Sequence, residues 1–400
     1  MFSEKLMSIL DKNRTFRPNQ CKIPRKISPV SSALKFLPHG LRIAGLNRRT
    51  LFRKGLLMTQ MKQLLLLGLG AGFLFAAAGC VAATDTGEGP PSVAVARSAS
   101  LERSIVLLQM QAQAQDPSTR ANCIEAFQSL QDPRVASVIE QGLHDIQPVV
   151  RFAAAMVSGK RQELKFKPVL EKMAASDDSD SVRVAATYAL RRLGDATNMN
   201  FLAQTLVSPD ASTRANTAFV LGLLGDPTAV PLLLSRRSET DSRVKFEISA
   251  ALARLGDPAA RRVITSLALS KYAEDQWNAL VVCGDLPADV AGNPLLIGLK
   301  EPLAIQDGTR EQSVRRQLLA ARSLGKQGST QGGKMCVTYL KDPAPSLRGL
   351  AALALGEMLY PSEERVLEPL LKDPDEGVQR AAAAAIVQVW ARNEAKVGRK

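Results

Sequence analysis

The chain has 400 residues, with 52 lysines and arginines against 38 aspartates and glutamates, a net charge of +14 that would suit a nucleic-acid or acidic membrane partner. Most of this excess lies in residues 1–60, which hold 13 basic and 2 acidic residues, whereas residues 81–400 hold 38 basic and 36 acidic ones. Because so balanced a region has no basic stripe to neutralise a phosphate backbone, we expect no nucleic-acid partner.

Histidine is scarce, because the chain contains only His39 and His144. This scarcity excludes histidine-based catalytic triads and histidine-rich metal sites. The acidic run from Asp177 to Asp180 resembles a calcium ligand set, but its place at a helix turn favours capping. The sequence also has no glycine-rich phosphate loop and no nucleophile elbow. We therefore expect no enzyme activity, no metal and no cofactor.

Residues 1–80 contain an export signal behind a basic leader. The signal spans residues 61–80, with Lys62, an apolar run over 64–78, and small residues before Cys80. The run is shorter than the roughly 20 residues of a membrane-spanning helix. Its end resembles a bacterial lipoprotein signal, which implies lipidation of Cys80; a plain cleaved signal and an uncleaved anchor are the alternatives. Because export signals begin a chain, residues 1–60 are interpreted as a start assigned too early, with Met58 or Met61 as the true start.

The segment 81–100 is rich in small and polar residues and has no helical periodicity. It is expected to be a flexible tether between the lipid and a folded region. The folded region would then be anchored to a membrane and face the periplasm or the cell surface.

The folded region is predicted over 101–391 from a short string that recurs every 31 residues. Leu-Gly-Asp is centred on Gly194, Gly225 and Gly256, and each copy follows a run rich in alanine and leucine with helical spacing. Gly225 suits a left-handed helix end, Asp226 the cap of the next helix, and Pro227 its first turn. The unit is thus two helices and two turns, and 101–391 holds about nine units, followed by a basic tail at 392–400.

This pattern resembles the HEAT-like repeats first grouped with the phycobilisome lyase family. The shared unit is roughly Asp-x-x-Val-Arg-x-x-Ala-Ala-x-Ala-Leu-Gly-x-Leu-Gly-Asp-Pro. The resemblance implies an all-α fold, an α-solenoid in which each unit contacts only its neighbours and the end units act as caps. With helices about 8–10 Å apart, nine units would form an arc on the order of 80 Å long.

A basic residue recurs near the start of each second helix, and a row of anion sites is one interpretation of it. The resemblance instead implies a structural ladder in which this residue pairs with turn carboxylates. The basic members are Arg120, Arg151, Arg183, Arg214, Lys245 and Arg348, and the acidic members are Asp195, Asp226 and Asp257.

The pattern weakens over residues 271–316, where Ala273 stands in place of the basic residue and Gly292, Pro294 and Pro302 interrupt the helix spacing. Because repeat proteins often place binding loops at such breaks, partner contact is considered for this stretch. The candidate contact residues are Tyr272, Trp277 and Asn293. Trp277 is also in the phase of Ala218, a core position, so packing is its main interpretation.

Together these features predict a lipid-anchored, non-enzymatic scaffold that binds another protein or peptide on its concave second-helix face. Two alternatives remain at this point: a bilin-lyase-like factor that handles a tetrapyrrole, and an envelope protein that associates with itself. Cys123, Cys283 and Cys336 lie too many repeats apart for a disulfide within an extended stack.

Overall fold

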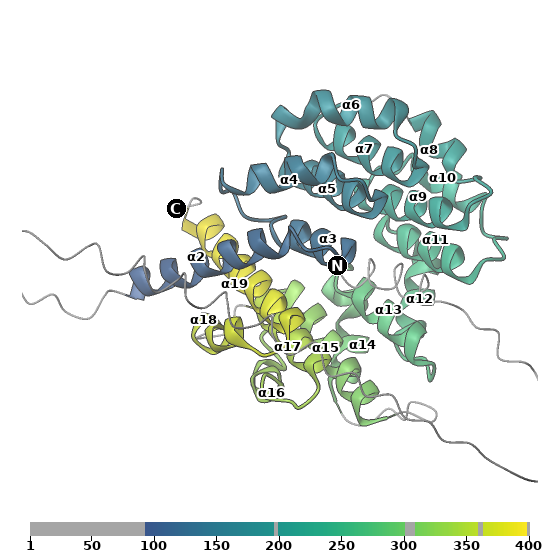
Figure 1. The fold of residues 1–400 in the computed structure, drawn as a ribbon. Helices are drawn as coiled ribbons and strands as arrows, with labels where there is room; N and C mark the ends of the chain where they lie inside the picture. Colours follow the sequence, from purple (N-terminus) through teal and green to yellow (C-terminus); the bar gives the residue numbers. More distant parts are fainter. Residues whose placement is uncertain (1–92, 196–198, 301–308, 359–362, 398–400) are drawn as a thin grey trace, which may run out of the picture. The chain divides into compact units, whose positions relative to one another are not determined.

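The computed structural model describes residues 93–195, 199–300, 309–358 and 363–397, and these residues form helices without a strand. They make nine pairs of a first helix and a second helix, which confirms the predicted α-solenoid of about nine units (Figure 1). The first helices are α2 (Val93–Gln111), α4 (Val135–Leu143), α6 (Lys167–Ser176), α8 (Met199–Thr205), α10 (Ala229–Leu234), α12 (Pro258–Leu267), α14 (Ala288–Leu299), α16 (Gly333–Tyr339) and α18 (Glu363–Leu367). The second helices are α3 (Pro117–Ala126), α5 (Pro148–Arg161), α7 (Asp180–Arg192), α9 (Ala211–Leu224), α11 (Ser242–Arg254), α13 (Ala273–Cys283), α15 (Arg310–Lys326), α17 (Pro345–Glu357) and α19 (Glu376–Val397). Short 3₁₀ helices, η2 (Leu164–Phe166) and η3 (Glu368–Lys372), precede α6 and follow α18.

The recurring glycine and aspartate set the helix ends much as the repeat predicts. Gly225 ends α9 with a φ of 69°, in the left-handed region that glycine adopts without strain. Asp257 caps α12, because its Oδ1 accepts a hydrogen bond from the Ala260 N–H at 2.7 Å, with Pro258 in the first turn. The copy at Asp226 differs: its carboxylate accepts from the N–H and hydroxyl of Thr228, and α10 begins only at Ala229, so that Pro227 precedes the helix.

A second glycine in the motif lets neighbouring second helices approach closely. A β-carbon added at Gly222 in α9 would lie 2.7 Å from the Cα of Ala251 in α11. The same relation holds between Gly356 in α17 and Ala385 in α19, also at 2.7 Å. The apolar core is therefore built from alanine and leucine faces held together at these crossings.

The repeat region is longer at both ends than the sequence pattern indicates. The helix α2 begins at Val93, inside the expected tether 81–100, because no proline or glycine lies between Pro91 and Pro117. The helix α19 continues to Val397, beyond the expected end at residue 391.

The irregular stretch 271–316 is mostly helical. The helix α14 passes through Gly292 and Asn293 and contains Pro294 in its interior, so the expected break there is wrong. Pro294 is buried in the core side of this helix, where a proline removes one backbone hydrogen bond without ending the helix. The insertion itself falls at residues 301–308, outside the described residues.

The main departure from the expected arc is that the first and last repeats pack on each other. Successive second helices pack together from α3 to α11 and from α13 to α19, and α12 packs on both α11 and α13. The helix α19 then packs against α2 and α3, at the other end of the chain (Figure 1). The expectation that the end units only cap an open stack is therefore wrong, and we call this packing the closing contact.

Candidate binding cavity at the closing contact

Arginines of the second helices form a row of ion pairs, as the ladder predicts. Their acidic partners, however, lie in the turn between the two helices of the next repeat, and not in the turn that contains Asp226 or Asp257. The Nε of Arg120 donates to Asp145 at 2.8 Å, and that of Arg348 donates to Asp373 at 2.8 Å. Each arginine also binds two carbonyl oxygens of the turn before its own helix, as Arg348 does at Asp342 and Pro343. Equivalent pairs join Arg151 to Asp177 and Arg214 to Glu239. Each guanidinium therefore ties its own turn to the turn of the next repeat.

The carboxylates of the repeated Gly-Asp string have other partners. Asp226 pairs with Arg191 at 2.9 Å, and Asp257 lies 3.6 Å from Arg237, so neither is the expected partner of a ladder arginine. The N–H of Asp195 donates to the carbonyl of Leu190 and helps to close α7.

Two ladder positions depart from the pattern because the next turn has no acid at the place that Asp145, Glu239 and Asp373 occupy. Twenty-five residues after Arg183 and Lys245 the sequence has Ser208 and Ser270. Arg183 instead pairs with Asp180 at 3.0 Å and lies over the ring of Phe201. Lys245 is exposed.

Arg380 extends the ladder across the closing contact. It is 32 residues after Arg348, on α19, the last described helix. Its Nη1 donates at 2.9 Å to Oε1 of Gln111, at the end of α2. The amide of Gln111 in turn donates to the carbonyl oxygen of Glu376 at 3.4 Å. The last described repeat is therefore hydrogen-bonded to the first through the residue in its ladder position.

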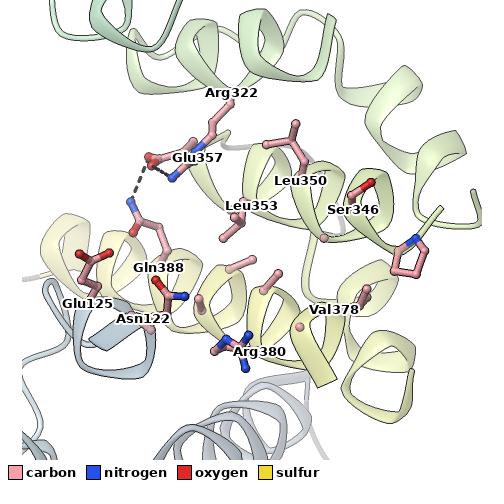
Figure 2. A pocket seen from close by; sticks show the side chains of 18 of the residues that line it. Asn122, Glu125, Arg322, Ser346, Leu350, Leu353, Glu357, Val378, Arg380 and Gln388 are labelled. Carbon is pink, nitrogen blue, oxygen red and sulfur yellow. Dashed lines mark hydrogen bonds and ion pairs between the residues drawn. The ribbon is translucent and has the colours of Figure 1, made fainter. Parts of the chain in front are cut away.

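A cavity of about 320 Å³ opens on the second-helix face beside this contact. Its wall comes from α3, α15, α17 and α19, so both ends of the repeat region contribute to it (Figure 2). The apolar part of the wall includes Leu350, Leu353 and Val378, together with alanines of α19. Small residues at the helix crossings leave this space open because they fill little of it.

Most polar side chains of the wall already have partners. Glu357 accepts from Gln388 at 3.0 Å and pairs with Arg322 at 3.8 Å (Figure 2). It also accepts from Arg392 at 2.6 Å. The remaining pairs are Gln128 with Lys160, Ser346 with Glu311, Asp375 with the N–H of Val378, Arg380 with Gln111, and Arg315 stacked 5.0 Å from the ring centroid of Trp277.

Two residues of α3 differ from the rest of the wall. Glu125 is 3% exposed, and neither of its carboxylate oxygens accepts a hydrogen bond from the described residues. The Oδ1 of Asn122, one turn earlier, is also buried without a described partner. Figure 2 shows the two side chains next to each other on α3, facing α19. Burial raises the pKa of Glu125 to about 8, despite the opposing charges of Arg322 and Lys160.

Charged residues from several repeats also interact with one another outside the cavity wall. Lys160 on α5 is exposed to solvent, yet its pKa is lowered because surrounding protein displaces water and because Lys326 lies nearby. Asp285, after α13, accepts from Arg254 at 2.9 Å and from Lys326 at 3.3 Å. These pairs connect α11, α13 and α15, where α11 and α13 have little direct packing.

The contact residues suggested by the sequence lie elsewhere. Tyr272 is 58% exposed at the start of α13, and Asn293 is exposed on α14, a first helix. Trp277 is half-buried and packs against the core, and only its stacking on Arg315 connects it to the cavity. Cys80 lies outside the described residues. The sequence pattern does not single out Glu125 or Asn122, because an isolated polar pair on a helix has no repeat signature.

The described residues contain no group of three or more histidine, cysteine, aspartate or glutamate side chains placed to hold a metal ion. Across the same part of the chain, no helix is both long and apolar enough to cross a membrane. Cys123, Cys283 and Cys336 are buried free thiols, and burial raises the pKa of each to about 12, which makes them poor nucleophiles.

A family model for HEAT repeats matches residues 106–191, 199–281 and 304–388. No curated protein sequence matches the chain. Among solved structures, the complex of CpcE and CpcF of phycocyanin lyase from Nostoc sp. is 18% identical with a TM-score of 0.39, covering 70% of this chain and 100% of that chain. Human deoxyhypusine hydroxylase in complex with glycerol is 17% identical with a TM-score of 0.31, covering 73% and 98%, and an engineered protein is 19% identical with a TM-score of 0.26, covering 76% and 92%. Likenesses this low say nothing of what the chain binds or does.

Proposed function

This chain belongs to the HEAT repeat family, and we propose that it is a non-enzymatic scaffold that binds a protein or peptide on its second-helix face. The observation that carries the proposal is the cavity between α3, α15, α17 and α19. Its apolar wall and few polar groups without partners suit an inserted side chain. Stacked repeats also offer a long continuous surface for the segments on either side of such an anchor.

We further propose that Cys80 carries a lipid and holds the repeat region at a bacterial envelope membrane. The support is the sequence over 61–80. Mass spectrometry of the N-terminus of the native protein tests this directly. We expect an acylated Cys80 and its loss in Cys80→Ala, whereas an intact Met1 would contradict both the lipid anchor and the start at Met58 or Met61.

The scaffold proposal is tested by affinity capture from envelope extracts with three forms of the protein. Leu353→Arg places a long charged side chain in the cavity, because Leu353 is half-buried in its wall. Val263→Arg is the matched control, because Val263 is 45% exposed on α12, a first helix. We expect the same partner to be retained by the natural chain and by Val263→Arg, and lost by Leu353→Arg. Identical sets of proteins on all three would show that the cavity binds no partner.

A further inference from the structure

The cavity contains three buried acceptor atoms, on Asn122 and Glu125, that have no hydrogen-bond donor among the described residues. They lie one helical turn apart on α3, so they face the same way. Carboxylate and amide oxygens that are buried without a hydrogen bond cost free energy, on the order of 1–3 kcal/mol for each polar group and more for a charge. A ligand that donates hydrogen bonds at this point would remove that cost.

The rest of the wall favours a cation over an anion. The arginines of the wall each already contact a residue of the fold: Arg315 lies over the ring of Trp277, Arg322 pairs with Glu357, and Arg380 donates to Gln111. The amide of Gln388 is likewise used on Glu357. The side chains of Asn122 and Glu125, in contrast, have no partner among the described residues, and their unmatched buried atoms are acceptors.

We propose that this cavity binds the ammonium or guanidinium group of a lysine or arginine side chain of a peptide partner, with Glu125 and Asn122 as its acceptors. The inference rests on the proposed scaffold function and adds the chemistry of the side chain that it recognises. The methylene stem of a basic side chain would pack along Leu350 and Leu353 while its charged end reaches α3.

The surroundings of Glu125 give this site a measurable proton linkage. Arg322 from α15 and Lys160 from α5 face Glu125, but burial outweighs them and keeps the pKa of its carboxyl near 8. A bound cation stabilises the carboxylate, so binding at neutral pH releases a proton. Affinity for the cation therefore rises as the pH rises through about 8.

The test is titration calorimetry on the full chain with short acetylated, amidated peptides that are identical except at a central lysine, arginine, norleucine or glutamate. The lysine and arginine peptides are expected to bind, with a heat that depends on the ionisation enthalpy of the buffer, and the other two are not. Glu125→Gln should weaken binding at least about tenfold, since it removes one partner of a buried charge pair, and should abolish the buffer dependence. Glu140→Gln, at an exposed glutamate of α4, is the matched control and should bind as the natural chain does.

Folding does not confuse this test, because Glu125→Gln removes a buried ionisable group without a partner and is expected to keep or raise the thermal midpoint. Equal binding of the lysine and glutamate peptides, or binding unchanged by Glu125→Gln, would overturn the proposal. Binding of spermidine that depends on Glu125, with no peptide binding, would overturn the assignment to a peptide. If Leu353→Arg loses a captured partner that Glu125→Gln retains, the scaffold function stands and the cation assignment is wrong.

Discussion

Single residues hold the repeats together in two ways, through the ladder and through the glycine crossings. In the ladder, Glu239 accepts from Arg214 at 2.9 Å and from the N–H of Asp241 at 3.0 Å, with its side chain 4% exposed. The Arg214 guanidinium and these backbone groups lower the pKa of Glu239 to about 2. The folded structure therefore stabilises the ionised carboxylate of Glu239.

The first prediction concerns acid stability. Because the pKa of Glu239 is lower in the folded state than in the unfolded state, its stabilising effect is complete above about pH 4.5 and is lost as the pH falls toward 2. We expect Glu239→Gln to lower the free energy of unfolding at neutral pH by about 1–3 kcal/mol. Denaturant titrations at pH 7 and pH 3 should show a smaller deficit at pH 3; a deficit independent of pH would contradict the ion pair.

The second prediction concerns the glycine crossings. In Gly222→Ala the new methyl group meets the backbone of Ala251, so the free energy of unfolding should fall by about 1–3 kcal/mol. Gly292→Ala in α14 is the matched control, because no atom lies within 4 Å of its added β-carbon. Alanine there should be neutral or stabilising, by up to about 1 kcal/mol. Equal effects of the two substitutions would show that α9 and α11 are not in close contact at Gly222.

At the scale of elements, what the sequence predicts correctly is local. The helix end at Gly225 and the cap at Asp257 depend on residues within one helical turn, and the repeat sequence predicts both. The partner of Arg348 could be predicted only from the spacing of 25 residues to Asp373, and the family resemblance did not indicate this spacing. The closing contact joins residues about 265 positions apart, as in Gln111 with Glu376, and no local pattern encodes it.

One signal of the closing contact was nevertheless present. Arg380 has the ladder phase in the last described repeat, so the phase predicts that it contacts a turn of another repeat. Glu125 gave no such signal, because its lack of a partner is a property of the packed helices around it. The cavity therefore follows from the closing contact, and both are tertiary features.

The third prediction tests the role of Arg380. We expect Arg380→Ala to loosen α2 from α19, because it removes the hydrogen bond to Gln111. Hydrogen exchange of the amides of α2 should become faster, while α7 and α9 keep their protection. Arg262→Ala, at an exposed arginine of α12, is the control and should leave α2 unchanged. If hydrogen exchange in α2 is unchanged in Arg380→Ala, the hydrogen bond between Arg380 and Gln111 does not stabilise the closing contact.

For the whole molecule, the closing contact changes what the repeats can do. An open stack offers only a surface, whereas repeats that meet end to end bring α3 against α19 and form a cavity that α17 also lines. The numbers of basic and acidic residues over 81–400 are nearly equal. This agrees with recognition of a partner by a few positioned side chains instead of by an electrostatic field over a large surface. Any motion that opens this contact would also open the cavity.

The most direct test of this structure is the distance between α2 and α19 in solution. Spin labels at Met110→Cys, where Met110 is 66% exposed, and at Glu376→Cys can be measured by double electron–electron resonance after Cys21 and Cys80 are changed to serine. Because packed helices lie about 8–10 Å apart, we predict a single short distance of roughly 25 Å or less between the labels. A distance on the order of 60–80 Å, as nine stacked units would give in an open arc, would contradict the closing contact and the cavity that depends on it.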